Sequence, residues 1–230
     1  MSVAVSSPVG RAVLWRLLSL GFMRPTSETH AEIEALAEAA FELDASPEVA
    51  AVLAVARSTG TDALAAEYQS LFGGTVAVAP YEGSYELDPI RQARQMADVA
   101  GFYRVFGAEA HGPAAERPDH VGCELEFLAF LELRRLAAAG EGDGEGAELA
   151  DEIAGTFLLD HARHWLPTFF DEVRAATPEG SALRALSALG VRLLETELER
   201  REIPFAPQKR RHTMLSVEGD SFACAGAERP

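Results

Sequence analysis

Prolines divide this chain into segments of helical length, and they constrain its fold more than any other feature. Inside a helix, proline removes a hydrogen bond and clashes with the preceding turn, but at the first helical position its missing N–H costs nothing. Six prolines stand at or just before the start of an apolar, periodic segment: Pro8, Pro25, Pro47, Pro89, Pro118 and Pro178. The spacing therefore predicts a series of short helices.

Apolar residues between these prolines recur three or four positions apart, as on one face of a helix, and they do not alternate as in a strand. Residues 75–78 favour a strand, but they are few and have no second segment to pair with. Ser46 before Pro47 and Asp88 before Pro89 are predicted helix N-caps. The pattern predicts an all-α fold of about nine helices, at residues 8–22, 28–44, 47–58, 61–72, 89–106, 119–139, 147–162, 164–176 and 181–201.

The 230 residues suffice for one sizeable core. Residues 1–203 are predicted to form a single globular helical domain, and residues 204–230 a polar, flexible tail. The glycine-rich acidic stretch 140–146 is interpreted as a flexible linker. Residues 12–23 resemble a signal peptide, but Arg16 interrupts the run and no cleavage site follows, so an amphipathic first helix is predicted.

The charge balance excludes several classes of partner. Against 20 Lys and Arg residues stand 36 Asp and Glu residues, which gives a net charge of −16 at pH 7. Such a surface repels phosphate backbones and anionic lipids, so nucleic-acid binding is not expected and a basic partner is favoured. No apolar run is long enough to span a bilayer, so membrane insertion is not expected. Cys123 and Cys224 form no disulfide framework, which fits a cytoplasmic protein.

The densest cluster of polar residues surrounds a predicted helix start. Pro118 forces a turn, after which Asp119 is the expected N-cap and His120 can pair with Glu124 one turn later. This structural interpretation competes with a functional one, in which the acidic residues at the helix start face a basic ligand. The cluster comprises Glu116, Arg117, Pro118, Asp119, His120, Glu124, Glu126 and Phe127.

A second cluster contains His161, His164 and Trp165. With His120 and Glu124 these histidines could form a metal site, yet no motif with metal-ligand spacing is present, so no metal is expected. The alternative is that His161 and Trp165 lie half-buried between two helices with their polar tips hydrogen-bonded.

A third cluster is the loop that carries Tyr81, Glu82 and Tyr85. A carboxylate beside aromatic rings suits an arginine, because the acid neutralises the guanidinium and the rings stack on it. The alternative is a loop tyrosine that only fixes the loop to the surface. Ser84 lacks the sequence context of a nucleophile, so hydrolase chemistry is not expected there.

Taken in order, several sequence blocks resemble the TorD/DmsD/NarJ family of maturation chaperones for molybdenum enzymes. The resemblance is greatest to the branch that serves type II dimethylsulfoxide-reductase-family enzymes, and it spans about residues 64 to 200. One departure is Ala79 before Pro80, where many relatives have cysteine. The blocks are residues 67–72, 80–82, 96–107, 116–120 with 124–127, and 157–161 with Trp165.

The resemblance implies an all-α fold with a hinge loop near residues 108–118, which would divide the domain into 1–110 and 119–203. It also implies a non-catalytic cytoplasmic chaperone without a cofactor of its own. Its partner would be the catalytic subunit of a molybdenum oxidoreductase that carries bis-molybdopterin guanine dinucleotide. The chaperone would bind the N-terminal, often twin-arginine, segment of that subunit and hold it back from export until the cofactor is inserted.

A receptor for such a segment needs carboxylates beside an apolar groove. The expected peptide-binding residues are Tyr81, Glu82, Tyr85, Tyr103, Glu116, Pro118, Asp119, His120, Glu124, Phe127 and His161. Two other classes of function also fit the sequence: a metal- or nucleotide-dependent hydrolase on a helical bundle, and a regulatory helical adaptor that binds a folded partner. Monomer and homodimer both fit.

Overall fold

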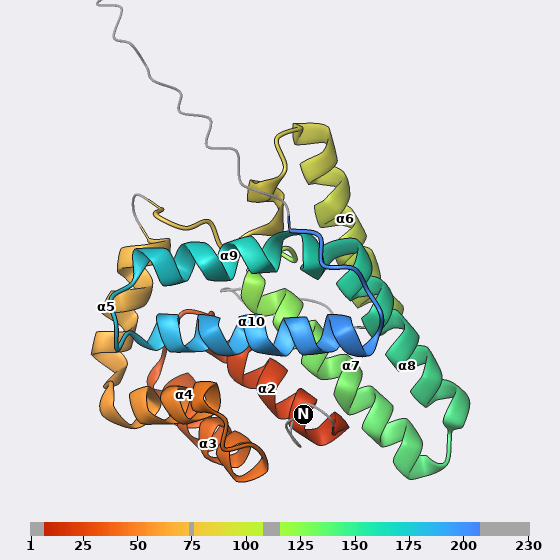
Figure 1. Cartoon of the computed structure of the whole chain (residues 1–230). Coiled ribbons are helices and arrows are strands. Elements are labelled where there is room, and N and C mark those ends of the chain that lie inside the picture. The colour runs from red at the N-terminus through yellow and green to blue at the C-terminus, as the bar shows by residue number, and fades with distance from the viewer. Residues whose placement is uncertain (1–6, 74–75, 108–115, 208–230) are drawn as a thin grey trace, which may run out of the picture.

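The all-α prediction is confirmed by a computed structural model, which describes residues 7–73, 76–107 and 116–207 (Figure 1). Among these residues there is no strand, only an isolated antiparallel bridge between Tyr81 and His120. The helices are α2 (Pro8–Gly21), α3 (Ser27–Leu43), α4 (Pro47–Ser58), α5 (Thr61–Phe72), the 3₁₀ turn η1 (Glu82–Tyr85), α6 (Pro89–Val105), α7 (Val121–Glu141), α8 (Gly144–Phe157), the π-helical turn η2 (Leu158–Ala162), α9 (Arg163–Ala176) and α10 (Ala182–Arg200).

Prolines start three of these helices, as the sequence predicts. α2, α4 and α6 have Pro8, Pro47 and Pro89 in their first turn. Asp88 caps α6 by accepting a hydrogen bond from the N–H of Ile90 at 2.9 Å. The prediction for Ser46 is only half right: it stands at the N-cap position, but its hydroxyl accepts from Arg192 Nη1 at 2.6 Å instead of capping α4.

The helix α2 lies at the centre of the molecule. It packs most extensively on α7 and also on α3, while α10 crosses it and α9 runs beside α10 (Figure 1). Leu14, Trp15 and Leu20 on α2 are all buried although they point to different faces of the helix, so this helix is buried over more of its circumference than the predicted amphipathic pattern. By contrast, α6 extends away from the body, and Val99 is its one fully buried residue.

The glycine-rich stretch 140–146 is a tight turn between two helices, and the prediction of a flexible linker is wrong. Gly142 adopts a left-handed conformation (φ 79°) that ends α7, and the N–H of Asp143 bonds to the carbonyl of Ala138 at 2.9 Å. The Asp143 carboxylate then accepts from the N–H of Gly146 at 2.9 Å and caps α8. Glycine followed by aspartate thus supplies a helix stop and a helix start in succession.

Two predicted regions fall largely outside the described residues. Of the proposed hinge, residues 108–115 are not described, and of the proposed tail, residues 208–230 are not described. Among the described residues, no single helix is long and apolar enough to cross a membrane. One pair of helices, α4 and α5, passes that test together, but the two are bent by 115° relative to each other.

Removal of the chain after Phe205 is expected to change the thermal midpoint by less than about 2 °C. Within the described part, truncation there removes Ala206 and Pro207 and one hydrogen bond, from His164 to the carbonyl of Ala206 at 3.3 Å. The Phe205 side chain itself is 51% exposed. Differential scanning calorimetry of the full and the truncated chain tests this, and a loss of many degrees would show that residues beyond Phe205 stabilise the body.

Candidate functional site

Two loops that the sequence treats as separate clusters meet in the structure. The N–H of Glu82 donates to the carbonyl of Asp119 at 2.9 Å, and the N–H of Val121 donates to the carbonyl of Pro80 at 2.8 Å. These bonds align the η1 loop with the turn before α7. The second cluster, with His161 and Trp165, joins them from the corner between α8 and α9, so the three sequence clusters form one site.

Three carboxylates of this site are almost fully buried: Glu82, Asp119 and Glu124. Buried charges are costly unless they are paired or hydrogen-bonded. Each of these acids has a partner in the chain. Glu82 bonds to Nδ1 of His161, with both oxygens 3.1 Å away, and Glu124 accepts from Nε1 of Trp165 at 2.9 Å.

The polar tips of His161 and Trp165 are hydrogen-bonded, as the structural interpretation of their cluster expects, although both residues are fully rather than half buried. His161 lies in the π-helical turn η2, and its Nε2 is 3.3 Å from the carboxylate of Asp98 on α6. Burial alone would lower the pKa of His161. The hydrogen bond and charge of Glu82, helped by Asp98, raise it above its ordinary value instead. These contacts join η1, η2 and α6, and they favour the protonated form of His161.

The predicted roles of Asp119 and His120 at the start of α7 are exchanged. His120 is the N-cap, and its Nδ1 accepts from the N–H of Gly122 at 3.1 Å. The predicted pair between His120 and Glu124 does not form, because Glu124 turns into the core towards Trp165. Burial lowers the pKa of His120, against the opposing charges of Glu116 and Asp119, so this histidine favours the neutral form.

Asp119 is not the N-cap of α7, and its side chain binds two other groups. Its Oδ2 accepts from the N–H of Gly83 at 3.2 Å. Its two oxygens also accept a fork from Arg117, with Nε at 2.9 Å and Nη2 at 2.8 Å. Arg117 lies over the ring of Tyr81, 4.7 Å from the centroid. The sequence predicts that Glu82 and its neighbouring tyrosines suit an arginine. The structure contains such an arginine within the chain, Arg117, but it pairs with Asp119 rather than with Glu82.

The other predicted aromatic residues fix the loops to the core. The hydroxyl of Tyr85 shares its one hydrogen between the carbonyl oxygen of Ala79, 3.2 Å away, and Glu172 Oε2, 3.1 Å away. The hydroxyl of Tyr103 donates to the carbonyl of Pro118 at 2.8 Å, and its ring packs against Phe127. Phe127 is buried. These contacts support the structural interpretation of Tyr85 as a tyrosine that fixes its loop.

Burial raises the pKa of Glu124 well above its ordinary value of 4.5, and the negative charge of Glu82 adds to the effect, while the Trp165 hydrogen bond opposes it. A carboxyl group whose pKa is higher in the folded state favours folding at low pH and opposes it as the pH rises. The free energy of unfolding of Glu124→Gln should therefore exceed that of wild type at neutral pH.

The difference should disappear below about pH 4 and grow above the ordinary carboxyl range by up to about 1.4 kcal/mol per pH unit, until the folded carboxyl itself ionises. Glutamine keeps an oxygen that can accept from Trp165, so the comparison isolates the charge. Urea denaturation of both proteins between about pH 4 and pH 8 measures the effect. Two parallel pH curves would contradict it.

The histidines and Glu124 are candidate metal ligands by residue type, although no metal is expected, and in the part of the chain that the structure describes they are not arranged as a metal site. Within the described ranges, no group of three or more His, Cys, Asp or Glu side chains is arranged to hold a metal ion. The Nδ1 of His164 lies 3.3 Å from the carbonyl oxygen of Ala206, far along the chain from the acids of the site. Burial raises the pKa of Cys123 to about 12, with nearby acids adding to the effect, so its thiol stays protonated.

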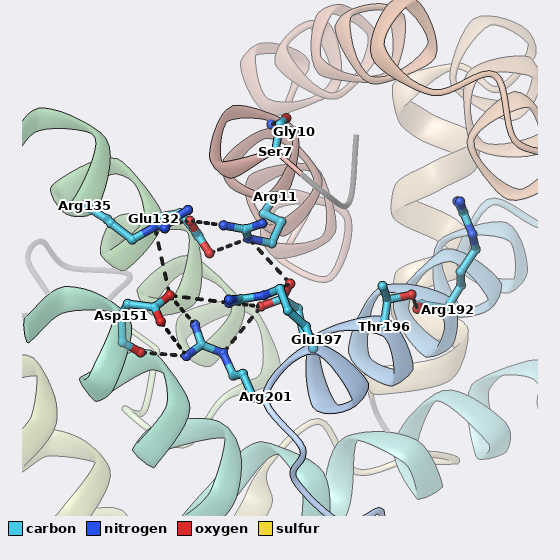
Figure 2. A network of polar contacts seen from close by, with 11 residues as sticks. Ser7, Gly10, Arg11, Glu132, Arg135, Asp151, Arg192, Thr196, Glu197 and Arg201 are labelled. Atoms are coloured by element: carbon cyan, nitrogen blue, oxygen red, sulfur yellow. Dashed lines mark hydrogen bonds and ion pairs between the residues drawn. The ribbon is translucent and has the colours of Figure 1, made fainter. Parts of the chain in front are cut away.

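A separate polar cluster, which the sequence did not predict, lies among α2, α7, α8 and α10 (Figure 2). Arg11 is buried, and its guanidinium bonds to Glu132 at 2.6 Å and contacts Glu197 at 3.4 Å. The signal was available, since Glu132 and Glu197 occupy core-facing positions in apolar stripes. A charge at such a position predicts a buried partner.

Asp151 on α8 belongs to the same cluster and binds two further arginines, Arg200 and Arg201. Arg201 donates to the carboxylate of Asp151 at 2.8 Å and to the backbone carbonyl of Asp151 at 2.7 Å (Figure 2). Burial alone would raise the pKa of Asp151, but the charges of Arg201 and Arg200 lower it. The cluster therefore joins four helices by ion pairs and has a structural role.

Comparison with known proteins assigns the fold and the chain to a family. The nitrate reductase delta subunit family matches residues 26–171, more than half of the chain. The chain belongs to this family, which confirms the resemblance to the TorD/DmsD/NarJ chaperones. A solved structure from Archaeoglobus fulgidus, described as a redox enzyme maturation protein, has a TM-score of 0.54 and 23% identity, over 82% of this chain and 93% of that one. This likeness supports the all-α fold.

Three curated relatives are similar to this chain. It is 37% identical over 119 residues to the chlorate reductase assembly chaperone protein of Ideonella dechloratans, over 50% of this chain and 60% of that protein. It is 39% identical over 111 residues to the selenate reductase assembly chaperone protein of Thauera selenatis, over 47% and 56%. It is 31% identical over 135 residues to the chaperone protein TorD of Aeromonas salmonicida, over 59% of each. The matches span less than two thirds of each relative's length.

Proposed function

We propose that this chain is a cytoplasmic, system-specific chaperone, without catalytic activity, for the catalytic subunit of a molybdenum oxidoreductase. It binds the N-terminal segment of that subunit and assists cofactor insertion and assembly before export. The observation that carries the proposal is the family match together with relatives named as assembly chaperones for chlorate and selenate reductases. The site supports it, because the family-like sequence blocks meet there.

The predicted peptide-binding residues fall into two groups by exposure. Glu82, Asp119 and Glu124 are buried and bonded within the chain. We therefore assign Glu82 and Glu124 to shaping the site, while Asp119 bonds to the exposed side chain of Arg117. His120, His161, Tyr85 and Phe127 are buried as well. The residues available for direct contact are Tyr81, Tyr103, Glu116 and Pro118, which are partly exposed, together with Arg117.

An apolar surface lies next to these exposed residues in the sequence. Leu87 is 56% exposed and Ile90, in the first turn of α6, is 65% exposed. An apolar stretch that follows two arginines in a client could cover such side chains, at roughly 25 cal/mol per Å² before the ordering cost of the peptide. The charge of −16 would attract its arginines, more strongly at low salt.

The experiment is a pull-down with the tagged chain from its own host grown anaerobically, followed by mass spectrometry. We expect the catalytic subunit of a molybdenum oxidoreductase, with its N-terminal segment intact. The same pull-down with that segment deleted should lose the subunit. Recovery that does not depend on the segment would favour an adaptor for a folded partner, and failure to recover any such subunit would overturn the proposal.

Titration calorimetry then defines the contact surface. The probe is a synthetic peptide with an Arg-Arg pair followed by an alanine-leucine stretch, and we expect Tyr81→Leu and Glu116→Gln to weaken its binding. The matched control is Glu38→Gln, which changes an exposed acid on α3 that pairs with Arg57. Equal weakening by Glu116→Gln and Glu38→Gln, with no effect of Tyr81→Leu, would show that net charge, rather than this site, attracts the peptide.

A further inference from the structure

Arg117 is held as a bound ligand would be. Its guanidinium makes a two-bond fork to Asp119 and lies over the ring of Tyr81, and the hydroxyl of Tyr81 donates to Glu116 at 3.3 Å. The backbone of Gly83 lies close against both side chains. A Cβ added to Gly83 would come within 3.1 Å of Asp119 Oδ2 and 3.7 Å of Arg117 Nη2. A buried carboxylate, an aromatic face and a close backbone are the groups that recognise a guanidinium.

The same arginine is free to leave. Its side chain is 51% exposed, whereas Asp119 is 0% exposed. The described contacts of its side chain are all to this cradle, and Arg117 and Asp119 are only two positions apart. Rotation of the side chain into solvent therefore breaks no other described contact. Arg11 differs, because its buried guanidinium joins helices far apart in sequence.

We propose that Tyr81, Asp119 and Glu116 form a guanidinium-binding cradle, which Arg117 fills until an arginine side chain of the client replaces it. The inference rests on the proposed function for the identity of the client, but the cradle itself does not. An exchange of this kind conserves the interactions at the site, because the client's arginine forms the same fork to Asp119 and the same contact with the Tyr81 ring that Arg117 formed. The buried carboxylate therefore has a cation both before and after the exchange, whereas a permanently empty site would be costly.

The internal arginine competes at high effective concentration, because it is tethered beside the cradle. The affinity of wild type for a free guanidinium is reduced by the fraction of time that Arg117 occupies the site. Removal of Arg117 eliminates the competitor and leaves Asp119 with the N–H of Gly83 as its described partner. The variant should be less stable than wild type, and it should bind guanidinium compounds better.

The first test measures thermal midpoints with methylguanidinium chloride at tens of millimolar, against sodium chloride at equal ionic strength. In Arg117→Ala we expect the midpoint to fall by about 5 °C and methylguanidinium to restore about half of that loss. Wild type should not respond. The matched control is Arg91→Ala, because Arg91 is 70% exposed and makes only long contacts to Glu86 and Asp88. Equal responses in all three proteins would overturn the cradle.

Arg117→Lys guards against a variant that fails to fold. Its ammonium still balances the charge of Asp119 but cannot form the fork, so methylguanidinium should stabilise this variant more than wild type. A response no larger than that of wild type would count against the proposal.

The second test titrates the Arg-Arg peptide into wild type and both variants. If Arg117 fills the cradle nine tenths of the time, its removal should tighten binding about tenfold. A Lys-Lys peptide should show no gain. Equal or weaker binding by Arg117→Ala would assign Arg117 to a fixed structural role and overturn the exchange. If wild type binds no client segment at all, the proposed function fails, while the methylguanidinium experiment still decides the cradle.

Discussion

Replacing Arg11 with methionine is expected to lower the free energy of unfolding by about 3 kcal/mol. Methionine fills the volume of the arginine stem but leaves Glu132 and Glu197 buried without the guanidinium that contacts both (Figure 2). The loss lies at the lower end for a broken buried ion pair, because Arg135 and Arg200 still reach these acids at 3.2 and 2.9 Å. Urea denaturation at neutral pH measures it.

The matched control is Arg16→Met on the same helix. Arg16 pairs with Glu32 and Glu126 at the surface, and exposed pairs contribute less than about 1 kcal/mol. A second comparison adds Glu132→Leu to Arg11→Met, which removes a buried charge together with its partner. The double variant should be more stable than Arg11→Met alone. Equal losses from Arg11→Met and Arg16→Met would contradict the assigned role.

Replacing Asp119 with alanine should cost about 2 to 3 kcal/mol. As the N-cap that the sequence predicts, Asp119 would contribute only about 1 kcal/mol. The structure raises the expectation, because the carboxylate is buried and binds both the N–H of Gly83 and the fork of Arg117. Its loss removes the side-chain bond between the turn before α7 and the η1 loop, and only the backbone bonds then join the two.

Two controls separate these roles. Asp119→Asn keeps an oxygen that can accept from Gly83 and loses only the charge, so its cost should be smaller. His120→Ala removes the observed cap on Gly122 and should cost about 1 kcal/mol. If His120→Ala proves more damaging than Asp119→Ala, the exchange of roles at this helix start is wrong.

The helices could be predicted because their signals are local. Pro8, Pro47 and Pro89 each sit in a first turn where the missing N–H has no cost. The turn at Gly142 was missed for a related reason: glycine and acidic residues suit both a flexible linker and a pair of caps, and composition does not distinguish them. Only the length of the flanking helices distinguishes a flexible linker from a pair of helix caps here.

The site could be predicted less well, because its pairings are long-range. The η1 loop and the start of α7 contain the residues that sequence reasoning selected, yet spacing favoured the local pair of His120 with Glu124. In the fold, Glu124 bonds to Trp165 and Glu82 bonds to His161, 41 and 79 positions away. Burial decides between these partners, and burial depends on the whole fold.

The π-helical turn η2 also limits how the length of this chain can vary. It joins α8 to α9 without a loop, and the helix axis changes direction there (Figure 1). An insertion or deletion in a loop is absorbed by the loop, but here each added or removed residue rotates everything downstream by about 100° about the helix axis. Loss of one residue from this turn would carry Trp165 and Phe169 out of the core. Homologous chains should therefore keep a constant number of residues across this corner, even where its sequence changes.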